Sequence, residues 1–413
     1  MSEVFGFFVL LTFLACVFAW ASSSVLLPFC IRHARRWGSL DRPNPRKLHQ
    51  MPTPRLGGLG ISPTIWFACA MALFAVDRVG PRLDLPAYWN PMLVGLLLGS
   101  GGMFLIGLLD DLKSMSASRK LLGQALVAAV VIAFLPIPQS IMGIELPQSL
   151  SLFLIFGWLL VVPNAINLMD GIDGLTSGML LVFLLTASVL AVAGQQSLLL
   201  MISLPLAVTI ISFLRFNWAP AKIFLGDSGS LSLGFVVAYL SLGVSFQSNS
   251  PGGHPQNWSL WISLLLVSVW LADTSIAVAR RYLSKAPRLK IFLKRSKITY
   301  FLLHQAAIRN IVRPDCRHLH HLALRSGFSV KSTVFLISAS LLSIHFSLLG
   351  FWLFAQSETK NFVAANLLPS LLICSSAVIF LQIVDQVRKK RSLEPSKEIP
   401  GIGASGPERK EVA

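Results

Sequence analysis

The chain has 413 residues, of which 54% are hydrophobic and only 13% are charged, and its mean hydropathy is +0.68. A soluble domain carries roughly 25% charged residues, so this composition excludes a water-soluble fold and indicates a membrane protein. The formal net charge is +17. In a soluble protein that balance would suggest nucleic acid as a partner, but in a membrane protein Lys and Arg collect in the cytoplasmic loops, so we expect no nucleic acid partner.

Eleven apolar stretches are long enough to span a bilayer core of about 30 Å, which requires roughly 20 residues in a helix. The first, 4–31, is longer than the apolar region of a signal peptide, lacks a preceding basic segment and is followed by Arg32, so we expect it to be retained. The other ten cover 58–76, 91–109, 120–138, 149–166, 176–193, 198–216, 231–247, 259–279, 332–354 and 364–387. We therefore predict an all-α, polytopic membrane protein.

The basic residues predict the orientation of these spans. Of the 35 Lys and Arg residues, all but Arg78, Arg82 and Lys360 lie in alternate connections or in the C-terminal tail. By the positive-inside rule, the N-terminus is outside and the C-terminus is cytoplasmic. We predict a single multi-span domain over 1–387, with a long cytoplasmic loop at 280–331. The remaining 388–413 form a basic tail, rich in Gly, Pro and charge, that we expect to be disordered.

Two adjacent carboxylates, Asp110 and Asp111, follow the third predicted span. Neighbouring carboxylates repel each other unless a cation or a proton lies between them, which favours a metal site, a proton acceptor, or both. The alternative is an ordinary helix cap.

A second polar cluster follows the fifth span and contains Asn164, Asn167, Asp170 and Asp173 at intervals of three residues. If the helix continues, these four side chains lie on or near one face, while Gly171 and Gly174 allow a turn. Amides can hydrogen-bond a base or a sugar, and the carboxylates can help to hold a metal. The alternatives are a calcium-binding loop, for which the segment is too short, and a plain polar turn.

The third candidate is Gly226-Asp227-Ser228-Gly229-Ser230, directly before the eighth span. Backbone N–H groups at a helix N-terminus can receive a phosphate, and Asp227 is placed to hold Mg²⁺ beside it. The fourth is Arg317-His318-Leu319-His320-His321 in the long loop. Zinc is one interpretation, but further ligands at a suitable spacing are lacking, and the cationic group is better suited to a diphosphate.

The predicted topology places all four motifs on the cytoplasmic side. There they offer what an enzyme needs to join a nucleotide diphosphate from the cytosol to a phosphate carried by a lipid.

On these motifs, which occur in the family's order between about residues 40 and 330, the chain resembles the polyprenyl-phosphate N-acetylhexosamine-1-phosphate transferases (glycosyltransferase family 4). The segments Asp41-Arg-Pro-Asn44-Pro-Arg46-Lys47-Leu-His49 and Pro52-Thr-Pro54-Arg55-Leu-Gly57-Gly58 resemble the GlcNAc-1-phosphate branch. So does the His-Leu-His-His form, because the pentapeptide branch has three consecutive histidines. Two departures are Ser114, where many members carry a third Asp, and a longer stretch between Arg281 and Asp315.

The resemblance implies transfer of a sugar phosphate, GlcNAc-1-phosphate by preference, from a UDP-N-acetylhexosamine to undecaprenyl phosphate with release of UMP. This would be the first step of a cell-envelope polysaccharide such as the lipopolysaccharide O-antigen, at the cytoplasmic face of the bacterial inner membrane. It also implies Mg²⁺, with Mn²⁺ as a substitute, contact with membrane lipid, and a homodimer as one oligomeric state.

The resemblance also implies residue roles. Asp227 is the leading metal ligand, with Asp170 as a second one, Asp110 or Asp111 activates the lipid phosphate, and Lys120 holds phosphate. Asn164, Asn167, Asp170 and Asp173 would line the nucleotide side, and Arg317, His318, His320 and His321 the diphosphate side. Two alternatives stay open: the same chemistry with UDP-MurNAc-pentapeptide or another UDP-N-acetyl sugar, and a transporter of an anionic solute.

Overall fold

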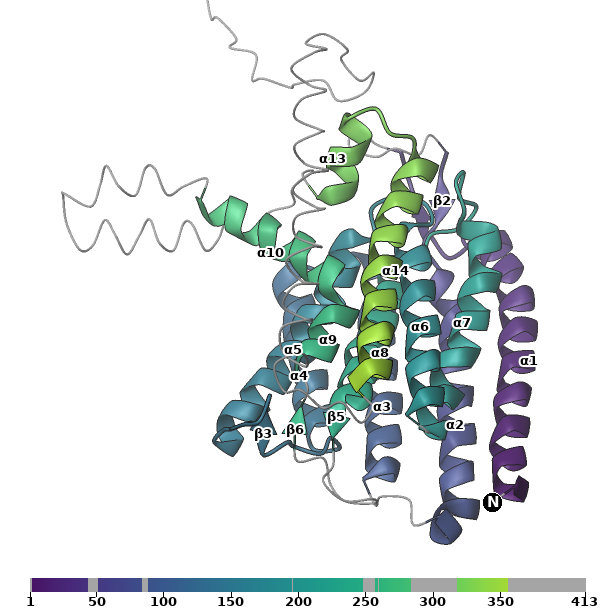
Figure 1. Cartoon of the computed structure of the whole chain (residues 1–413). Helices are drawn as coiled ribbons and strands as arrows, with labels where there is room; N and C mark the ends of the chain where they lie inside the picture. The colour runs from purple at the N-terminus through teal and green to yellow at the C-terminus, as the bar shows by residue number, and fades with distance from the viewer. Residues whose placement is uncertain are drawn as a thin grey trace, which may run out of the picture.

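The computed structural model is a bundle of helices (Figure 1). It describes residues 2–43, 51–83, 88–194, 196–247, 257–258, 260–283 and 318–355. The helices are α1 (Ser2–His33), α2 (Gly57–Leu83), α3 (Trp89–Lys113), α4 (Ala117–Ile132), α5 (Gln148–Met169), α6 (Leu175–Ala193), α7 (Ser197–Asn217), α8 (Gly226–Ser245), α9 (Leu260–Leu266), α10 (Ser268–Leu283), α13 (Leu319–Arg325) and α14 (Val330–Ala355). The predicted eleventh span, 364–387, and the predicted disordered tail lie outside the described residues.

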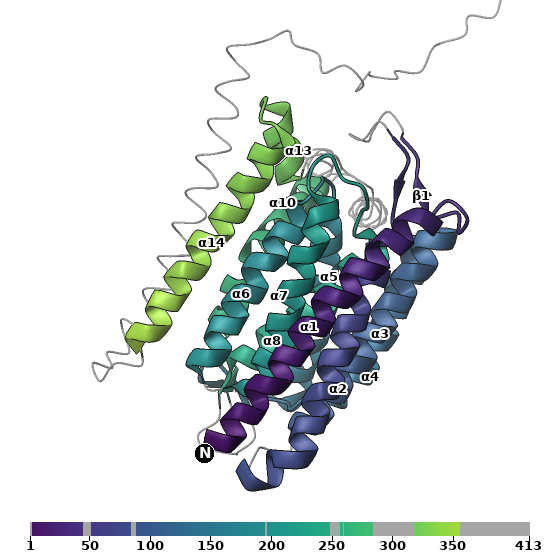
Figure 2. The ribbon, with the colours of Figure 1, turned by 90° about the vertical axis from the view of Figure 1, so that its right-hand side faces the viewer.

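Two small sheets lie at opposite ends of the bundle (Figures 1 and 2). At the end of the bundle that carries α13, the strands β1 (Leu40–Asp41) and β2 (Thr53–Pro54) pair antiparallel. At the other end, β3 (Ser140–Ile141), β4 (Ile144–Glu145), β5 (Phe246–Gln247) and β6 (Asn257–Trp258) form a four-stranded sheet in the order β4-β3-β6-β5. Each strand has two residues, so the fold is all-α in essence, as predicted.

Eight helices in the described part of the chain are long and apolar enough to cross a membrane, and a ninth crossing results if the bent pair α9 and α10 counts as one span. The fourth predicted span, 120–138, is shorter than expected because α4 ends at Ile132, before Pro136 and Pro138. Its 16 residues cover about 24 Å at 1.5 Å per residue, less than a typical hydrocarbon core.

The central helix is α8, which is buried along almost its whole length and packs against α2, α3, α5, α6, α7 and α9. Glycines allow this close packing, as expected where helices associate inside a membrane. A Cβ at Gly107 of α3 would collide with the backbone of Asp227, and one at Gly99 would overlap the ring of Phe235. The sequence thus fixes how closely α3 approaches the start of α8.

The predicted ninth span, 259–279, is broken at Val267, and its two halves meet at 81°. The break leaves the carbonyl of Leu266 without a partner within the helix. His345 of α14 fills this need, since its Nε2 donates to the Leu266 carbonyl at 3.0 Å. The other ring nitrogen lies 2.9 Å from the hydroxyl of Thr186 in α6. His345 of α14 therefore holds the bend, and Thr186 of α6 holds His345.

Candidate active site

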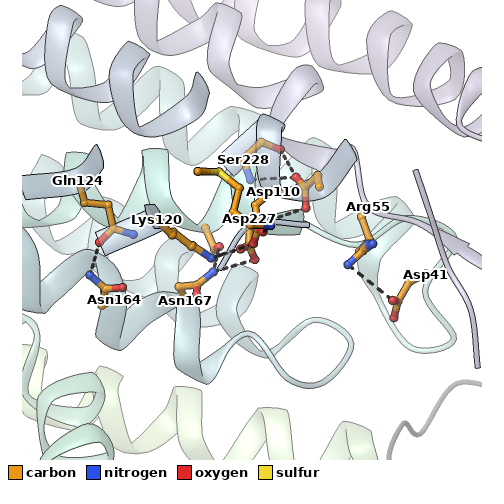
Figure 3. Close-up of polar contacts among 12 residues, drawn as sticks. Asp41, Arg55, Asp110, Lys120, Gln124, Asn164, Asn167, Asp227 and Ser228 are labelled. Carbon is orange, nitrogen blue, oxygen red and sulfur yellow. Dashed lines mark hydrogen bonds and ion pairs between the residues drawn. The ribbon is translucent and has the colours of Figure 1, made fainter. Parts of the chain in front are cut away.

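A lysine bridges two carboxylates at the end of the bundle that carries α13 (Figure 3). Nζ of Lys120, in the first turn of α4, contacts Oδ2 of Asp110 at 3.2 Å and also Oδ2 of Asp227. The three side chains are only partly buried, with 15% of Lys120, 19% of Asp110 and 27% of Asp227 exposed. A cation and two anions that remain accessible can exchange these partners for a phosphate and a metal.

The turn between α3 and α4 brings Lys120 to the aspartates. Ser116, in extended conformation, caps α4 by accepting from the backbone N–H of Arg119, and the amide of Met115 donates to Asp110. Lys120 therefore lies in the first turn of a new helix, ten residues after Asp110.

Asn167, near the end of α5, orients Asp227. Its Nδ2 donates to Oδ1 of Asp227 at 3.0 Å and to the hydroxyl of Ser230 at 2.7 Å. An amide donor and an ammonium donor thus hold the two oxygens of one carboxylate, and α4, α5 and α8 meet at Asp227.

Asp111 points away from this cluster and caps α8. One of its oxygens accepts from the backbone N–H of Asp227 and the other from that of Ser228, both at 2.9 Å, and the Ser228 hydroxyl adds a bond of 2.7 Å. Only 3% of Asp111 is exposed. The prediction that these N–H groups are open to a phosphate is wrong, because a carboxylate from α3 already satisfies them. Asp110 is then the member of the pair whose carboxylate contacts Lys120.

Of the two possibilities for Asn164, Asn167, Asp170 and Asp173, a continuing helix with a shared face or a turn at the glycines, the structure has the turn. The helix α5 ends at Met169, and the chain turns through Gly174, which has a φ of +77°. Asn164 lies deeper and donates to Gln124 of α4 and to the Leu160 carbonyl at 2.8 Å. Asp173 accepts from the amide of Ala221 at 2.9 Å and so ties the turn to the segment after α7.

Asp170 follows α5 directly. Burial is the main reason that the pKa of this carboxyl is raised to about 7; a hydrogen bond from Thr176 opposes the shift, and the charges of Asp111 and Asp173 add to it. A cation bound beside Asp170 would favour its ionised form.

The histidine motif reaches this turn through α13. His320 is 1% exposed, and a Cβ at Gly171 would collide with its ring, so α13 packs directly on the residue after Asp170. Both ring nitrogens of His320 lack a hydrogen-bond partner among the described residues. Burial lowers the pKa of His320 well below 6.5, and the neighbouring His321 and His318 add to this effect. Arg317 and most of the longer loop before it lie outside the described residues.

The structure adds residues that the sequence analysis missed. Asn217, at the end of α7, accepts from the Gly174 amide at 3.1 Å and donates to the Ile223 carbonyl at 2.9 Å, which joins the two turns beside the site. Asp273 of α10 binds His318. Asn217 could have been found from the sequence, because it is a polar residue at the end of an apolar span. Asp273 could not, because it lies 45 residues before its partner His318 and no local spacing connects the two.

The hairpin β1–β2 approaches the same place. Pro54 accepts from the amide of Phe224 at 2.8 Å, and the amides of Gly57 and Gly58 donate to residues 224 and 225 at 3.0 Å. Arg55 forms a long ion pair of 3.8 Å with Asp41 (Figure 3). All described residues of the four predicted motifs therefore lie at one end of the bundle.

One end of the multi-span bundle thus carries a partly exposed lysine and two carboxylates, beside polar turns and histidines. Residues 93–245 match the model of glycosyl transferase family 4. A "Probable undecaprenyl-phosphate N-acetylglucosaminyl 1-phosphate transferase" of Bacillus subtilis is 30% identical over 88% of this chain and 88% of its own length. The chain belongs to glycosyl transferase family 4.

Two further relatives show the breadth of the similarity. An undecaprenyl-phosphate alpha-N-acetylglucosaminyl 1-phosphate transferase of Thermotoga maritima is 30% identical over 77% of this chain and 82% of its own. A phospho-N-acetylmuramoyl-pentapeptide-transferase of Bacillus cytotoxicus is 30% identical over 54% of this chain and 70% of its own. The chain is therefore an enzyme, and the alternative of an anion transporter is set aside.

Proposed function

We propose that the protein transfers GlcNAc-1-phosphate from UDP-GlcNAc to undecaprenyl phosphate and releases UMP. The observation that carries the proposal is the group of Lys120, Asp110 and Asp227 at one end of a membrane bundle, where a lipid phosphate and a soluble nucleotide can meet. The names of the relatives from Bacillus subtilis and Thermotoga maritima support this donor and this acceptor.

In the proposed reaction, an oxygen of undecaprenyl phosphate attacks the phosphorus that carries the sugar. The bond from this phosphorus to the bridging oxygen breaks, and UMP leaves with that oxygen. Asp110 accepts the proton of the lipid phosphate, because the other aspartate of the pair is engaged with α8. Lys120 neutralises charge on the transferring group, and Asn167 keeps Asp227 oriented.

The donor set fits Mg²⁺, which usually takes one or two carboxylates and completes its shell with substrate phosphates and water. Asp227 offers a partly exposed carboxylate, and Asp170 offers a second carboxylate directly after α5. When bound, the ion would neutralise charge on the phosphates. Among the described residues, no three His, Cys, Asp or Glu side chains converge on one metal position, so substrate would supply the remaining ligands.

The histidines lie on the donor side of this site. His320 covers Gly171, and His318 and His321 have their ring centroids 6.0 and 4.2 Å from that of His320. We assign the three rings and Arg317 to the diphosphate, and Asn164, Asp170 and Asp173 to the walls of the nucleotide pocket, where Asn164 and Asp173 act through the bonds that shape the turns.

The test is an assay of purified protein with undecaprenyl phosphate and a panel of UDP-sugars, in which UMP release and the lipid product are both measured. UDP-GlcNAc should give UMP only when the lipid is present. Product from UDP-MurNAc-pentapeptide alone would select the second candidate, which the Bacillus cytotoxicus relative suggests. Asp227→Asn or EDTA should abolish turnover, while Asp77→Asn, at a side chain that is 80% exposed, should not.

The same proposal places the site at the cytoplasmic face of the bacterial inner membrane. Arg35 and Arg36 after α1 and Lys113 and Arg119 around the turn between α3 and α4 lie at the site's end of the bundle, where the positive-inside rule puts the cytoplasm.

A further inference from the structure

Asp273 is a buried carboxylate outside the cluster described above. It lies on α10, is 4% exposed, and uses both oxygens on the histidine motif. Oδ2 lies 2.7 Å from Nδ1 of His318, and Oδ1 accepts from the backbone N–H of Leu319, also at 2.7 Å. Burying a carboxylate costs free energy unless the carboxylate is paired. The two short hydrogen bonds of Asp273 provide that pairing, and they suggest a role for this residue.

The first bond determines which nitrogen of His318 carries the proton. An ionised carboxylate can only accept hydrogen bonds, so Nδ1 of His318 is the protonated nitrogen. The second nitrogen, Nε2, then faces Nη2 of Arg281 at 3.5 Å. The His318 ring is nearly parallel to that of His320, with an angle of 6° between the planes. Asp273 thus fixes both the tautomer and the plane of the ring.

The second bond fixes the start of α13. The amide of Leu319 is the first of that helix, and the side chain of His318, the residue at the cap, forms no capping bond of its own. Asp273 supplies the missing acceptor from another helix. Because α13 carries His320 onto Gly171, the position of α13 determines where His320 lies relative to Asp170.

We propose that Asp273 is a positioning residue for the donor side of the site: it holds His318 in one tautomer and holds α13 against the Gly171 turn, so that the histidines are oriented toward the diphosphate of the UDP-sugar. The inference rests on the proposed function. Asp273 lies in the second turn of α10, just after the bend of the ninth span, and its two bonds join α10 to α13.

Kinetics of single and double variants test this role. Asp273→Ala should raise KM for UDP-GlcNAc about 10-fold or more, as expected for loss of a charged hydrogen bond, while KM for undecaprenyl phosphate stays within about twofold. Asp273→Glu keeps the charge and should recover part of the loss. Asp273→Asn keeps one acceptor for Leu319 but offers His318 a donor, so it should retain the melting temperature better than Asp273→Ala without restoring KM.

A double variant separates positioning from plain stability. Because Asp273 acts in part through His318, Asp273→Ala combined with His318→Ala should lose less than the product of the two single losses, and the loss beyond that of His318→Ala measures the bond to Leu319. Asp77→Asn, the same charge loss at an exposed position, is the matched control. A fall in kcat and in folded protein with both KM values unchanged would overturn the inference, as would multiplicative losses in the double variant.

Failure of the proposed function would look different. A wild-type protein that neither releases UMP nor binds UDP-GlcNAc in calorimetry would remove the function and this inference with it. A wild-type protein that does both, with Asp273→Ala indistinguishable from Asp77→Asn, would remove the positioning role alone.

Discussion

Asp110 and Asp111 are neighbours in sequence but have different surroundings. Successive residues on a helix point about 100° apart, so one carboxylate of such a pair can face the site while the other faces the packed interior. Asp110 meets Lys120, and Asp111 meets the start of α8. The sequence offers both explanations for the pair, catalysis and capping. The structure shows capping for Asp111, and the proposed function gives catalysis to Asp110.

This division predicts opposite consequences for two equal substitutions. Asp110→Asn should reduce kcat about 100-fold or more, because the site loses its proton acceptor, while the melting temperature stays close to wild type. Asp111→Asn should lower the stability by about 2 kcal/mol, because an amide presents a donor to two backbone donors of α8. Thermal melting of purified protein alongside UMP release compares them, and equal melting temperatures would contradict the assignment.

We expect His320 to make the stability of the folded protein depend on pH. Its pKa is well below 6.5 in the folded protein because of burial, whereas the unfolded chain binds a proton near 6.5. The unfolded state therefore binds more protons as the pH falls below about 6.5, and stability should decline there by at most about 1.4 kcal/mol per pH unit. Stability should be insensitive to this group above pH 6.5.

The measurement is the melting temperature between pH 5 and 8 for wild type and His320→Asn. The variant should show a shallower decline on the acid side because it lacks the titrating ring. His33→Asn, at a ring near the exposed end of α1, is the control and should keep the wild-type slope. An unchanged slope in His320→Asn would show that the ring is not responsible.

At the residue scale, the predictable part of the site is the part with unusual chemistry. Charged groups at the ends of apolar spans are costly, which singled out Asp110 and Asp227 from the sequence, whereas Lys120 was named only through the family resemblance. Gln124 and Asp273 escaped because each is one polar residue in a helix, and its partner is known only once α4 meets α5 or α10 meets α13. The spacing of residues along the chain does not show which side chains of different helices will form hydrogen bonds.

At the scale of elements, the contact between α3 and α8 determines the geometry of the cluster. Gly107 lets the backbone of α3 approach Asp227, and Gly226, with a φ of +72°, starts α8 beside Asp111. A side chain at Gly107 would push the start of α8 away and would separate Asp227 from Lys120.

A pair of alanine variants on one helix tests this contact. Gly107→Ala should destabilise the protein by about 1–3 kcal/mol, as overpacking does, and should lower kcat because Asp227 moves. Gly101→Ala, where the nearest atom to a new Cβ lies 3.9 Å away, should be tolerated. The melting temperature and the rate of UMP release are measured for both variants. Equal effects of the two substitutions would argue against a close contact at Gly107.

Most helices could be predicted from apolar length, because the bilayer imposes one strong rule on every span. The errors lie where local chemistry overrides that rule. Prolines follow α4 and shorten it, and Gly171 follows the end of α5 within the polar cluster. The break at Val267 has no glycine or proline at the bend, and its bonding partner, His345, comes from a helix 79 residues away along the chain.

At the scale of the whole molecule, the described motifs come together at one end of the bundle because successive spans reverse direction. Asp111 and Ser228 are 117 residues apart, and Lys120 and Asp227 are 107 residues apart, yet both pairs are in contact. The alternation of basic loops predicted that these motifs share a side, although it could not predict which residues touch. The opposite end carries the sheet of β3 to β6, far from the proposed chemistry (Figure 1).

This arrangement predicts which positions are reachable from each side of the membrane. With native cysteines replaced, single cysteines at Arg36 and Lys222 lie at the site's end, and one at Glu145 lies in the sheet at the opposite end; all three positions are exposed. A membrane-impermeant maleimide added to intact cells should label the cysteine at position 145 and should label those at 36 and 222 only after the membrane is opened. Because undecaprenyl phosphate is used together with a cytosolic nucleotide in the proposed reaction, labelling of position 222 from outside would place the carboxylates on the wrong face and would contradict the proposed function itself.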